Sequence, residues 1–472
     1  MNKSVNSQIA TGAVWMVLLR LSVKGLGLIS TLILARLLTP DDFGIMTLSF
    51  SIYTMIELIR EFGFDTVLIQ KQRKDRELYD SAFTLQMLFS LLATLLIISL
   101  SGILTDFYQD IRLQNALYIM AGIVFITGFT NIGIVQFRKE MTFNKEFQYQ
   151  LVIKLSGFFV TLPLAWYLKN YWALLIGTLV SNVSAVLLSY TMVKYKPKFN
   201  FSKIKEIMSF SSWLFLNNVL FFLNHHSQNF VLGKTSGSSS VGVFAIAHEI
   251  ATLTTNELVA PINRAAFPGY SKLKHNPHEL KDSYLKVLSN IVLIAVPTAF
   301  GIATVTPTFV PVVLGEKWTQ TIPLIQVIAL ASVLSSMNTN SAYIYLVLAK
   351  QKITTYVTVF RLSIFLPLLT ILSYKYGPLG AAYSILITSS ITFPLNQFLI
   401  KKNLGVTFSE LISIFYRPFI SALIMSATIL LFRDNVELPV AIQLMLEVIL
   451  GATVFVVCNL SLWSAAGKPN SA

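Results

Sequence analysis

The segment Gly12–Leu38, GAVWMVLLRLSVKGLGLISTLILARLL, is long enough to span a lipid bilayer and carries two cations within it. Arg20 and Lys24 are four residues apart, so they share one face of the predicted helix. At a rise of about 1.5 Å per residue, Lys24 lies roughly 18 Å from Gly12, near the middle of a hydrocarbon core about 30 Å thick. Even the lower insertion scales give about 2.5–3.5 kcal/mol for a cation at that depth. The pair therefore requires an aqueous cavity or an anionic partner.

Two interpretations of this pair remain open. In the first, Arg20 reaches the nearer headgroup layer and Lys24 pairs with a carboxylate of a neighbouring helix. In the second, both cations face a cavity that receives an anionic ligand. The rest of the sequence favours the second interpretation.

Composition identifies an integral membrane protein. Hydrophobic residues make up 54% of the 472 residues and charged residues only 12%, whereas soluble domains carry about 25% charged residues. The net charge of +14 is spread through short polar loops and forms no single patch, which argues against nucleic acid as a partner. The single cysteine, Cys458, provides neither a disulfide framework nor a metal-ligand cluster. The N-terminus lacks a small-residue cleavage site, so we expect the first helix to be retained.

Hydropathy predicts an all-α fold of about fourteen transmembrane helices. Lysines and arginines gather in alternate loops, and the positive-inside rule then places both termini in the cytoplasm. Prolines inside several spans are compatible with this assignment, because neighbouring helices can satisfy the freed backbone groups. The predicted spans are 12–38, 43–63, 81–104, 114–136, 147–168, 171–193, 208–232, 240–262, 284–312, 321–348, 354–374, 378–400, 413–432 and 439–463.

A faint internal repeat divides the first twelve spans. Pro40–Ile52, PDDFGIMTLSFSI, matches Ser238–Ile250, SSSVGVFAIAHEI, and two further pairs of segments follow at the same offset of about 200 residues. Parallel repeats of this kind predict two pseudo-symmetric six-helix bundles. The predicted domains are an N-terminal bundle at 1–200, a C-terminal bundle at 201–405, and two additional helices with a short tail at 406–472.

The segment Ala35–Gln70, ARLLTPDDFGIMTLSFSIYTMIELIREFGFDTVLIQ, resembles the first outer loop and second helix of Wzx-type polysaccharide flippases. These belong to the multidrug/oligosaccharidyl-lipid/polysaccharide exporter superfamily. The charged loops Gln70–Phe83 and Phe137–Gln150 resemble the same group, in particular its exporters of colanic-acid-like and teichuronic-acid-like units. The resemblance implies a V-shaped central cavity between two six-helix bundles. It also implies that undecaprenyl-diphosphate-linked oligosaccharide moves from the cytoplasmic to the outer leaflet of a bacterial inner membrane by alternating access.

Buried cations suit such a substrate, because a diphosphate that enters a membrane needs groups that replace its hydration. Arg20 offers a bidentate fork to phosphate oxygens and Lys24 a mobile point charge. His225 and His226 give the seventh span a polar wall, although a membrane histidine also serves as a hydrogen-bond donor between helices. The predicted residues of the diphosphate site and cavity are Arg20, Lys24, Arg60, His225, His226, Arg264 and Arg361.

Several of these cations have a second interpretation. Arg60 also fits an anchor in the inner loop. Lys154, Arg361 and Arg417 follow inner loops, so their side chains can extend to the headgroups.

Energy coupling is assigned to carboxylates. Glu57, Glu249 and Glu257 are the candidates for proton or sodium coupling, because burial raises a carboxyl pKa. Each also fits a role in neutralising a nearby cation. Glu249 and Glu257 are eight residues apart and are expected on one helical face. The sequence has no Walker-type nucleotide loop, so we expect no ATP drive, no cofactor and no metal site.

Two other classes of protein remain as alternatives to the flippase. An ion-coupled multidrug or metabolite exporter of the same superfamily is the alternative, but its cationic substrates favour carboxylates in the first helix, which here has none. A membrane enzyme needs catalytic residues in sizeable outer loops, and no such grouping is present. We therefore expect a non-enzymatic flippase for surface polysaccharide, with lipid-linked oligosaccharide, membrane lipids, and a polysaccharide polymerase or export machinery as its partners.

Overall fold

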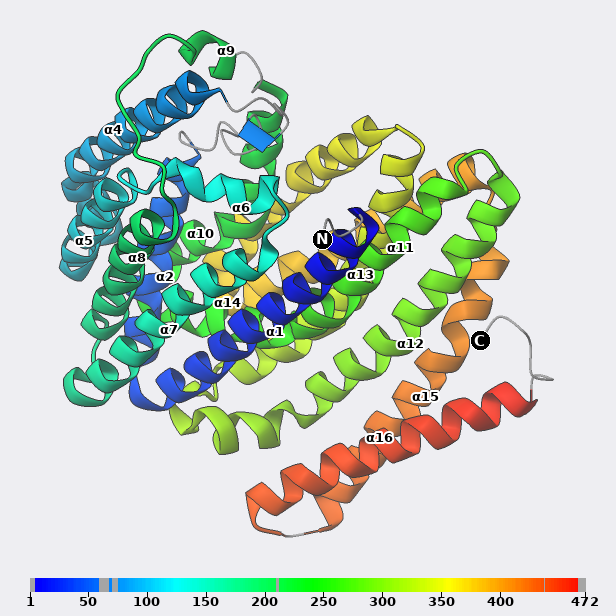
Figure 1. Cartoon of the computed structure of the whole chain (residues 1–472). Coiled ribbons are helices and arrows are strands. Elements are labelled where there is room, and N and C mark those ends of the chain that lie inside the picture. Colours follow the sequence, from blue (N-terminus) through cyan, green and yellow to red (C-terminus); the bar gives the residue numbers. More distant parts are fainter. Residues whose placement is uncertain (1–4, 59–67, 70–74, 209–211, 437, 466–472) are drawn as a thin grey trace. The chain divides into compact units, whose positions relative to one another are not determined.

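The computed structural model describes residues 5–58, 68–69, 75–208, 212–436 and 438–465, and these residues form helices and connecting segments without a strand (Figure 1). The chain divides into two compact units, Met1–Gly242 and Val243–Ala472. This division leaves the predicted bundles at 1–200 and 201–405, with the extra helices at 406–472, as a prediction. The V-shaped cavity between them is likewise still a prediction.

The first unit begins with α1 and ends within α10. Its helices are α1 (Val5–Leu37), α2 (Pro40–Glu57), α4 (Arg76–Tyr108), α5 (Ile111–Thr127), α6 (Val135–Lys139), α7 (Phe143–Leu168), α8 (Trp172–Met192), α9 (Ile204–Met208) and most of α10 (Ser212–Ala251).

The second unit continues from the end of α10. Its helices are a π-helix (Thr254–Val259), α11 (Ala260–Lys272), α12 (Pro277–Phe309) with a π-helical extension (Val310–Leu314), α13 (Thr321–Val347), α14 (Gln351–Leu404), α15 (Phe408–Asn435) and α16 (Val440–Ala465). A short 3-10 helix (Glu316–Trp318) precedes α13.

Among the described residues, nine helices are long and apolar enough to cross a membrane, or ten if the bent pair Ile111–Thr127 and Ile132–Lys139 forms one span. Helix α14 has 54 residues and α10 has 40, and each is interrupted where a glycine adopts positive φ, at Gly377 (57°) and Gly237 (81°). Helix α14 therefore contains two of the predicted spans, and α10 contains most of one and the first half of the next. Spans 43–63 and 208–232 include some residues outside the described part of the chain. Within that part the predicted spans fall largely on helices, which confirms the all-α membrane fold.

Local sequence explains where several helices begin. Thr39 and Asp42 form a capping box at the start of α2, with Pro40 in the first helical turn. Asp75 and Asp110 cap α4 and α5 by accepting from backbone N–H groups of the first turn. These caps satisfy N–H groups that a helix cannot pair internally.

The last two helices are fastened to α12 by a buried ion pair. Arg433 of α15 donates from Nε and Nη2 to the two carboxylate oxygens of Glu447 of α16, at 2.8 and 2.9 Å, and Glu447 is fully buried. Nη2 of Arg433 also donates to the carbonyl of Thr304, and Thr308 donates to Glu447. This network fixes the hairpin α15–α16 within the second unit.

Candidate functional site

The predicted cation pair lies on α1, close to α7. Arg20 is half-buried and Lys24 is exposed. Gly27 follows Lys24 by three residues and therefore lies on the same face of the helix. From α7, Nζ of Lys154 reaches to 3.8 Å from the position that a Cβ would occupy at Gly27. The structure thus gathers three cations, Arg20, Lys24 and Lys154, on one side of α1; we call them the cation group.

Aromatic packing holds α7 against α1 beside this group. The rings of Trp15 on α1 and Phe147 on α7 have centroids 5.1 Å apart. Lys154 lies seven residues, or two turns, after Phe147 and so projects from the same face of α7. Val17 and Leu21 are exposed on α1 near the cations, which gives the cation group an apolar border.

Two histidines of α10 differ in their surroundings. His226 is half-buried, with Nδ1 3.4 Å from the hydroxyl of Ser51 on α2, and its ring stacks on Phe222 at a centroid distance of 5.0 Å. Asn229 donates to the same hydroxyl at 2.9 Å. His225 is exposed, and its ring lies 4.3 Å from that of Phe221. His226 therefore contributes to the contact between α2 and α10, while His225 lies at the surface.

The remaining predicted residues are distributed over both units. Glu57 is buried at the end of α2, whereas Arg60 lies outside the described residues. In the second unit, Arg361 of α14 is half-buried, and its Nε is a buried donor with no hydrogen-bond partner in the described part of the chain. Arg264 is exposed on α11. Arg264 and Arg361 belong to the second unit, whereas the cation group belongs to the first.

The two carboxylates of the eighth span lie on either side of a change in helix type. Glu249 is exposed near the end of α10, and Glu257 is half-buried inside the π-helix Thr254–Val259. A π-helix turns through a smaller angle per residue than an α-helix, so α-helical spacing does not describe this pair. Their joint role in coupling stays a prediction.

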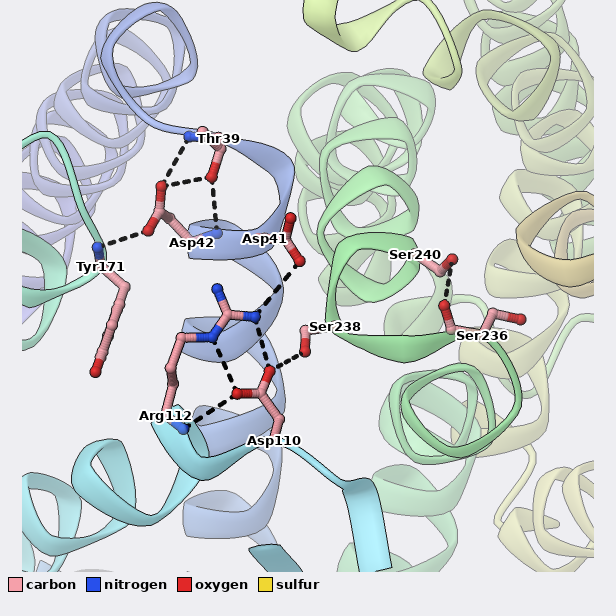
Figure 2. A network of polar contacts seen from close by, with 9 residues as sticks. All are labelled: Thr39, Asp41, Asp42, Asp110, Arg112, Tyr171, Ser236, Ser238 and Ser240. Atoms are coloured by element: carbon pink, nitrogen blue, oxygen red, sulfur yellow. Dashed lines mark hydrogen bonds and ion pairs between the residues drawn. The ribbon is translucent and has the colours of Figure 1, made fainter.

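Sequence reasoning missed a polar network near the start of α2 (Figure 2). Asp42 is buried; one of its carboxylate oxygens accepts from Thr39, and the other accepts from the backbone N–H of Tyr171 at 2.8 Å. The capping box therefore also connects α2 to the segment that precedes α8. The sequence TPDD carried the signal for the cap, but not for this long-range partner.

The second part of the network connects three segments through one carboxylate. Arg112 of α5 donates from Nε and Nη2 to Asp110 at 3.0 and 2.8 Å, and Nη2 lies 3.6 Å from Asp41 of α2. The hydroxyl of Ser238 on α10 donates to Asp110 at 2.6 Å (Figure 2). Burial raises the pKa of Asp110, but the hydrogen bonds from Arg112 and Ser238 outweigh it and hold this pKa below its ordinary value. Asp110 is therefore an ionised centre that joins α2, α5 and α10; we call these four residues the Asp110 network.

Comparisons with known proteins agree with this architecture. A family model described as polysaccharide biosynthesis protein matches residues 33–323. The lipopolysaccharide biosynthesis protein WzxC of Escherichia coli (strain K12) is 26% identical over 423 residues, which cover 88% of this chain and 86% of WzxC. The teichuronic acid biosynthesis protein TuaB of Bacillus subtilis (strain 168) is 20% identical over 425 residues, which cover 87% of each chain.

Solved structures share the fold. The lipid II flippase MurJ in an inward closed conformation superimposes with a TM-score of 0.79 at 14% identity, over 97% of this chain and 99% of MurJ. An inward-facing multidrug resistance MATE family transporter of the MOP superfamily gives a TM-score of 0.62 at 14% identity, over 84% of this chain and 99% of the transporter. The family match, which spans more than half of the chain, shows that the chain belongs to the polysaccharide biosynthesis protein family.

Proposed function

We propose that this membrane protein is a flippase that carries undecaprenyl-diphosphate-linked oligosaccharide from the cytoplasmic to the outer leaflet of a bacterial inner membrane. The observation that carries the proposal is the cation group of Arg20, Lys24 and Lys154 on two membrane-spanning helices. A diphosphate cannot enter hydrocarbon without groups that replace its hydration, and three neighbouring cations offer both a planar fork and mobile ammonium groups. The apolar border at Val17 and Leu21 suits a substrate whose charged head is attached to a lipid chain.

Alternating access is the mechanism that we assign to this flippase. Such a mechanism needs an outer end that closes while the cation group loads from the cytoplasm. The Asp110 network supports this assignment, because it fastens α2 and α5 to α10 by charge-assisted bonds that can be broken and reformed. In the proposed orientation both termini lie in the cytoplasm, which places this network on the outer side.

Carboxylates within the membrane are the proposed coupling groups. Glu57, which is buried in the last turn of α2, and Glu257, in the π-helix, are the stronger candidates for proton or sodium coupling. Glu249 is the third. Arg361, Arg264, Arg60 and the histidines His225 and His226 stay proposed contributors to the substrate pathway.

The test of this function is export of surface polysaccharide by variants of the cation pair. We expect Arg20→Ala and Lys24→Ala to lower export by roughly tenfold or more, because losing one charge-assisted bond to phosphate costs on the order of 1.5–3 kcal/mol. Lys352→Ala, at an exposed lysine near the start of α14, is the matched control and should export normally. Normal export by both α1 variants, at equal amounts of inserted protein, would remove the cationic site from the mechanism.

A further inference from the structure

The segment Val193–Lys205, VKYKPKFNFSKIK, carries five lysines and no acidic residue. It leads from the end of α8 to α9, and its residues up to Asn200 have no regular secondary structure (Figure 1). None of the motifs that indicate transport lies in it. Its lysines and phenylalanines therefore indicate a role separate from the transport site.

This segment is pinned to the beginning of α4. Asp80, which is buried, accepts from the hydroxyl of Tyr195 and from the backbone N–H of Lys198, the latter at 2.8 Å. The carbonyl of Tyr195 accepts from Asn131 at 2.6 Å. Two more backbone N–H groups are held by hydroxyls of α4, that of Asn200 by Thr84 at 2.9 Å and that of Lys203 by Ser81 at 3.2 Å. The backbone is thus fixed even where no helix or strand forms.

The fixed backbone turns one side of the segment outward. In extended chain, alternate side chains point to opposite sides. Tyr195 and Pro197 are half-buried, whereas Lys194, Lys196 and Lys198 are exposed. Beyond them, Lys205 is exposed, and the rings of Phe199 and Phe201 remain 67% and 64% exposed. We call the six exposed residues Lys194, Lys196, Lys198, Phe199, Phe201 and Lys205 the lysine–phenylalanine strip.

The depth of this strip follows from the length of α4. Its 33 residues make a helix about 50 Å long, which exceeds a hydrocarbon core of about 30 Å by roughly 20 Å. The side chains that pin the segment, Asp80, Ser81 and Thr84, lie in the first turns of α4, so the segment lies at the level of the lipid headgroups. At that level lysines meet lipid phosphates and aromatic rings meet the interface.

We propose that the lysine–phenylalanine strip binds the anionic phospholipid headgroups of the leaflet that surrounds it. Positive charge attracts the phosphates, and the exposed phenylalanines insert between headgroups, which is the combination that distinguishes membrane-surface segments from ordinary charged loops. In the described part of the chain, none of the ion pairs includes the four exposed ammonium groups of the strip. The proposal rests on membrane insertion but neither on the transported substrate nor on the orientation of the termini.

The test uses the full chain in lipid nanodiscs of phosphatidylcholine, with or without one quarter phosphatidylglycerol. A Ser202→Cys variant in a Cys458→Ser background carries an environment-sensitive fluorophore beside Phe201. We expect phosphatidylglycerol to lower quenching by neutral acrylamide at least about twofold. Salt at 0.5 M should reverse most of this protection, because the screening length falls to about 4 Å.

Two quadruple variants distinguish an effect of the lysines in the strip from an effect of the net charge of the protein. Lys194, Lys196, Lys198 and Lys205 changed to Gln should abolish the effect of phosphatidylglycerol, whereas Lys272, Lys274, Lys401 and Lys402 changed to Gln remove the same charge from exposed positions of the second unit and should preserve it. Equal quenching in both lipids for the unchanged protein, or equal loss in both quadruple variants, would overturn the proposal.

A photo-crosslinking residue at Phe201 in intact cells decides between lipid and protein as the occupant. Adducts with phospholipid support the proposal. Adducts with another protein alone would overturn it in favour of a protein-docking surface. Both readouts are independent of polysaccharide export, so a failure of the proposed flippase function would leave them interpretable.

Discussion

Gly44 and Gly242 lie against each other in a reciprocal way that matches the internal repeat of the sequence. A Cβ at Gly44 would lie 1.7 Å from the carbonyl oxygen of Ser238, and a Cβ at Gly242 would lie 1.9 Å from that of Pro40. Pro40 and Gly44 are the repeat counterparts of Ser238 and Gly242. Two equivalent helix beginnings therefore cross with their backbones in contact, and the Asp110 network surrounds the crossing.

The crossing predicts a specific effect of a single methyl group. Gly44→Ala or Gly242→Ala must push α2 away from α10, because the obstacle in each case is backbone. We expect a cysteine at Ser240, in a Cys458→Ser background, to react several-fold faster with a membrane-impermeant maleimide. Gly102→Ala is the matched control, since a Cβ there meets nothing within 4 Å. Unchanged labelling in both crossing variants, with normal insertion, would show that this contact does not close the outer end.

The Asp110 carboxylate predicts a dependence of stability on pH. Its folded pKa is depressed, so its stabilising contribution is complete above the unfolded pKa of about 3.9 and is lost as pH falls through the lower folded value. The Tm of the purified protein should therefore exceed that of the Asp110→Asn variant. We expect this difference in Tm to be constant from pH 7 to about 5 and to shrink below about pH 4. Asn retains the helix cap, which makes this variant a test of charge. A difference in Tm that does not change with pH would contradict this assignment.

The cation group predicts non-additive losses of export. Lys154→Gln should reduce surface polysaccharide as Lys24→Ala does, and the double variant should lose less than the product of the two effects, because both ammonium groups serve one ligand. Lys145→Gln, an exposed lysine at the beginning of the same helix, is the control. Multiplicative losses would indicate that Lys154 acts at a separate place, as the headgroup-anchoring interpretation requires.

Hydropathy was sufficient to predict the helices. It did not predict every change of helix type, or which residues of different helices contact one another. Gly237 of TSGSSS and Gly377 of YGPLG lie between predicted spans, and both adopt positive φ there. The π-helix before Pro261 was not predicted; a proline has no N–H to donate four residues back, and this favours a widened turn. Asp41, Asp110 and Ser238 come together only through tertiary packing, so their network left no local pattern. For Lys154 the sequence indicated the headgroups, because it does not show that α7 places Nζ of Lys154 beside Gly27 of α1.

The ion pair of Arg433 and Glu447 predicts how the stability of the protein depends on the contacts that hold α15 and α16 against α12. Removing only one partner, as in Glu447→Ala, leaves a buried guanidinium without its counter-ion and should destabilise the protein by about 3–5 kcal/mol. The double variant Arg433→Met/Glu447→Leu leaves no unpaired charge and should lose clearly less, although it also removes the bonds to Thr304 and Thr308. Chemical unfolding in detergent measures both values. If the double variant were as unstable as Glu447→Ala, the hydrogen bonds to α12, and not the pairing of charges, would hold α15 and α16 in place.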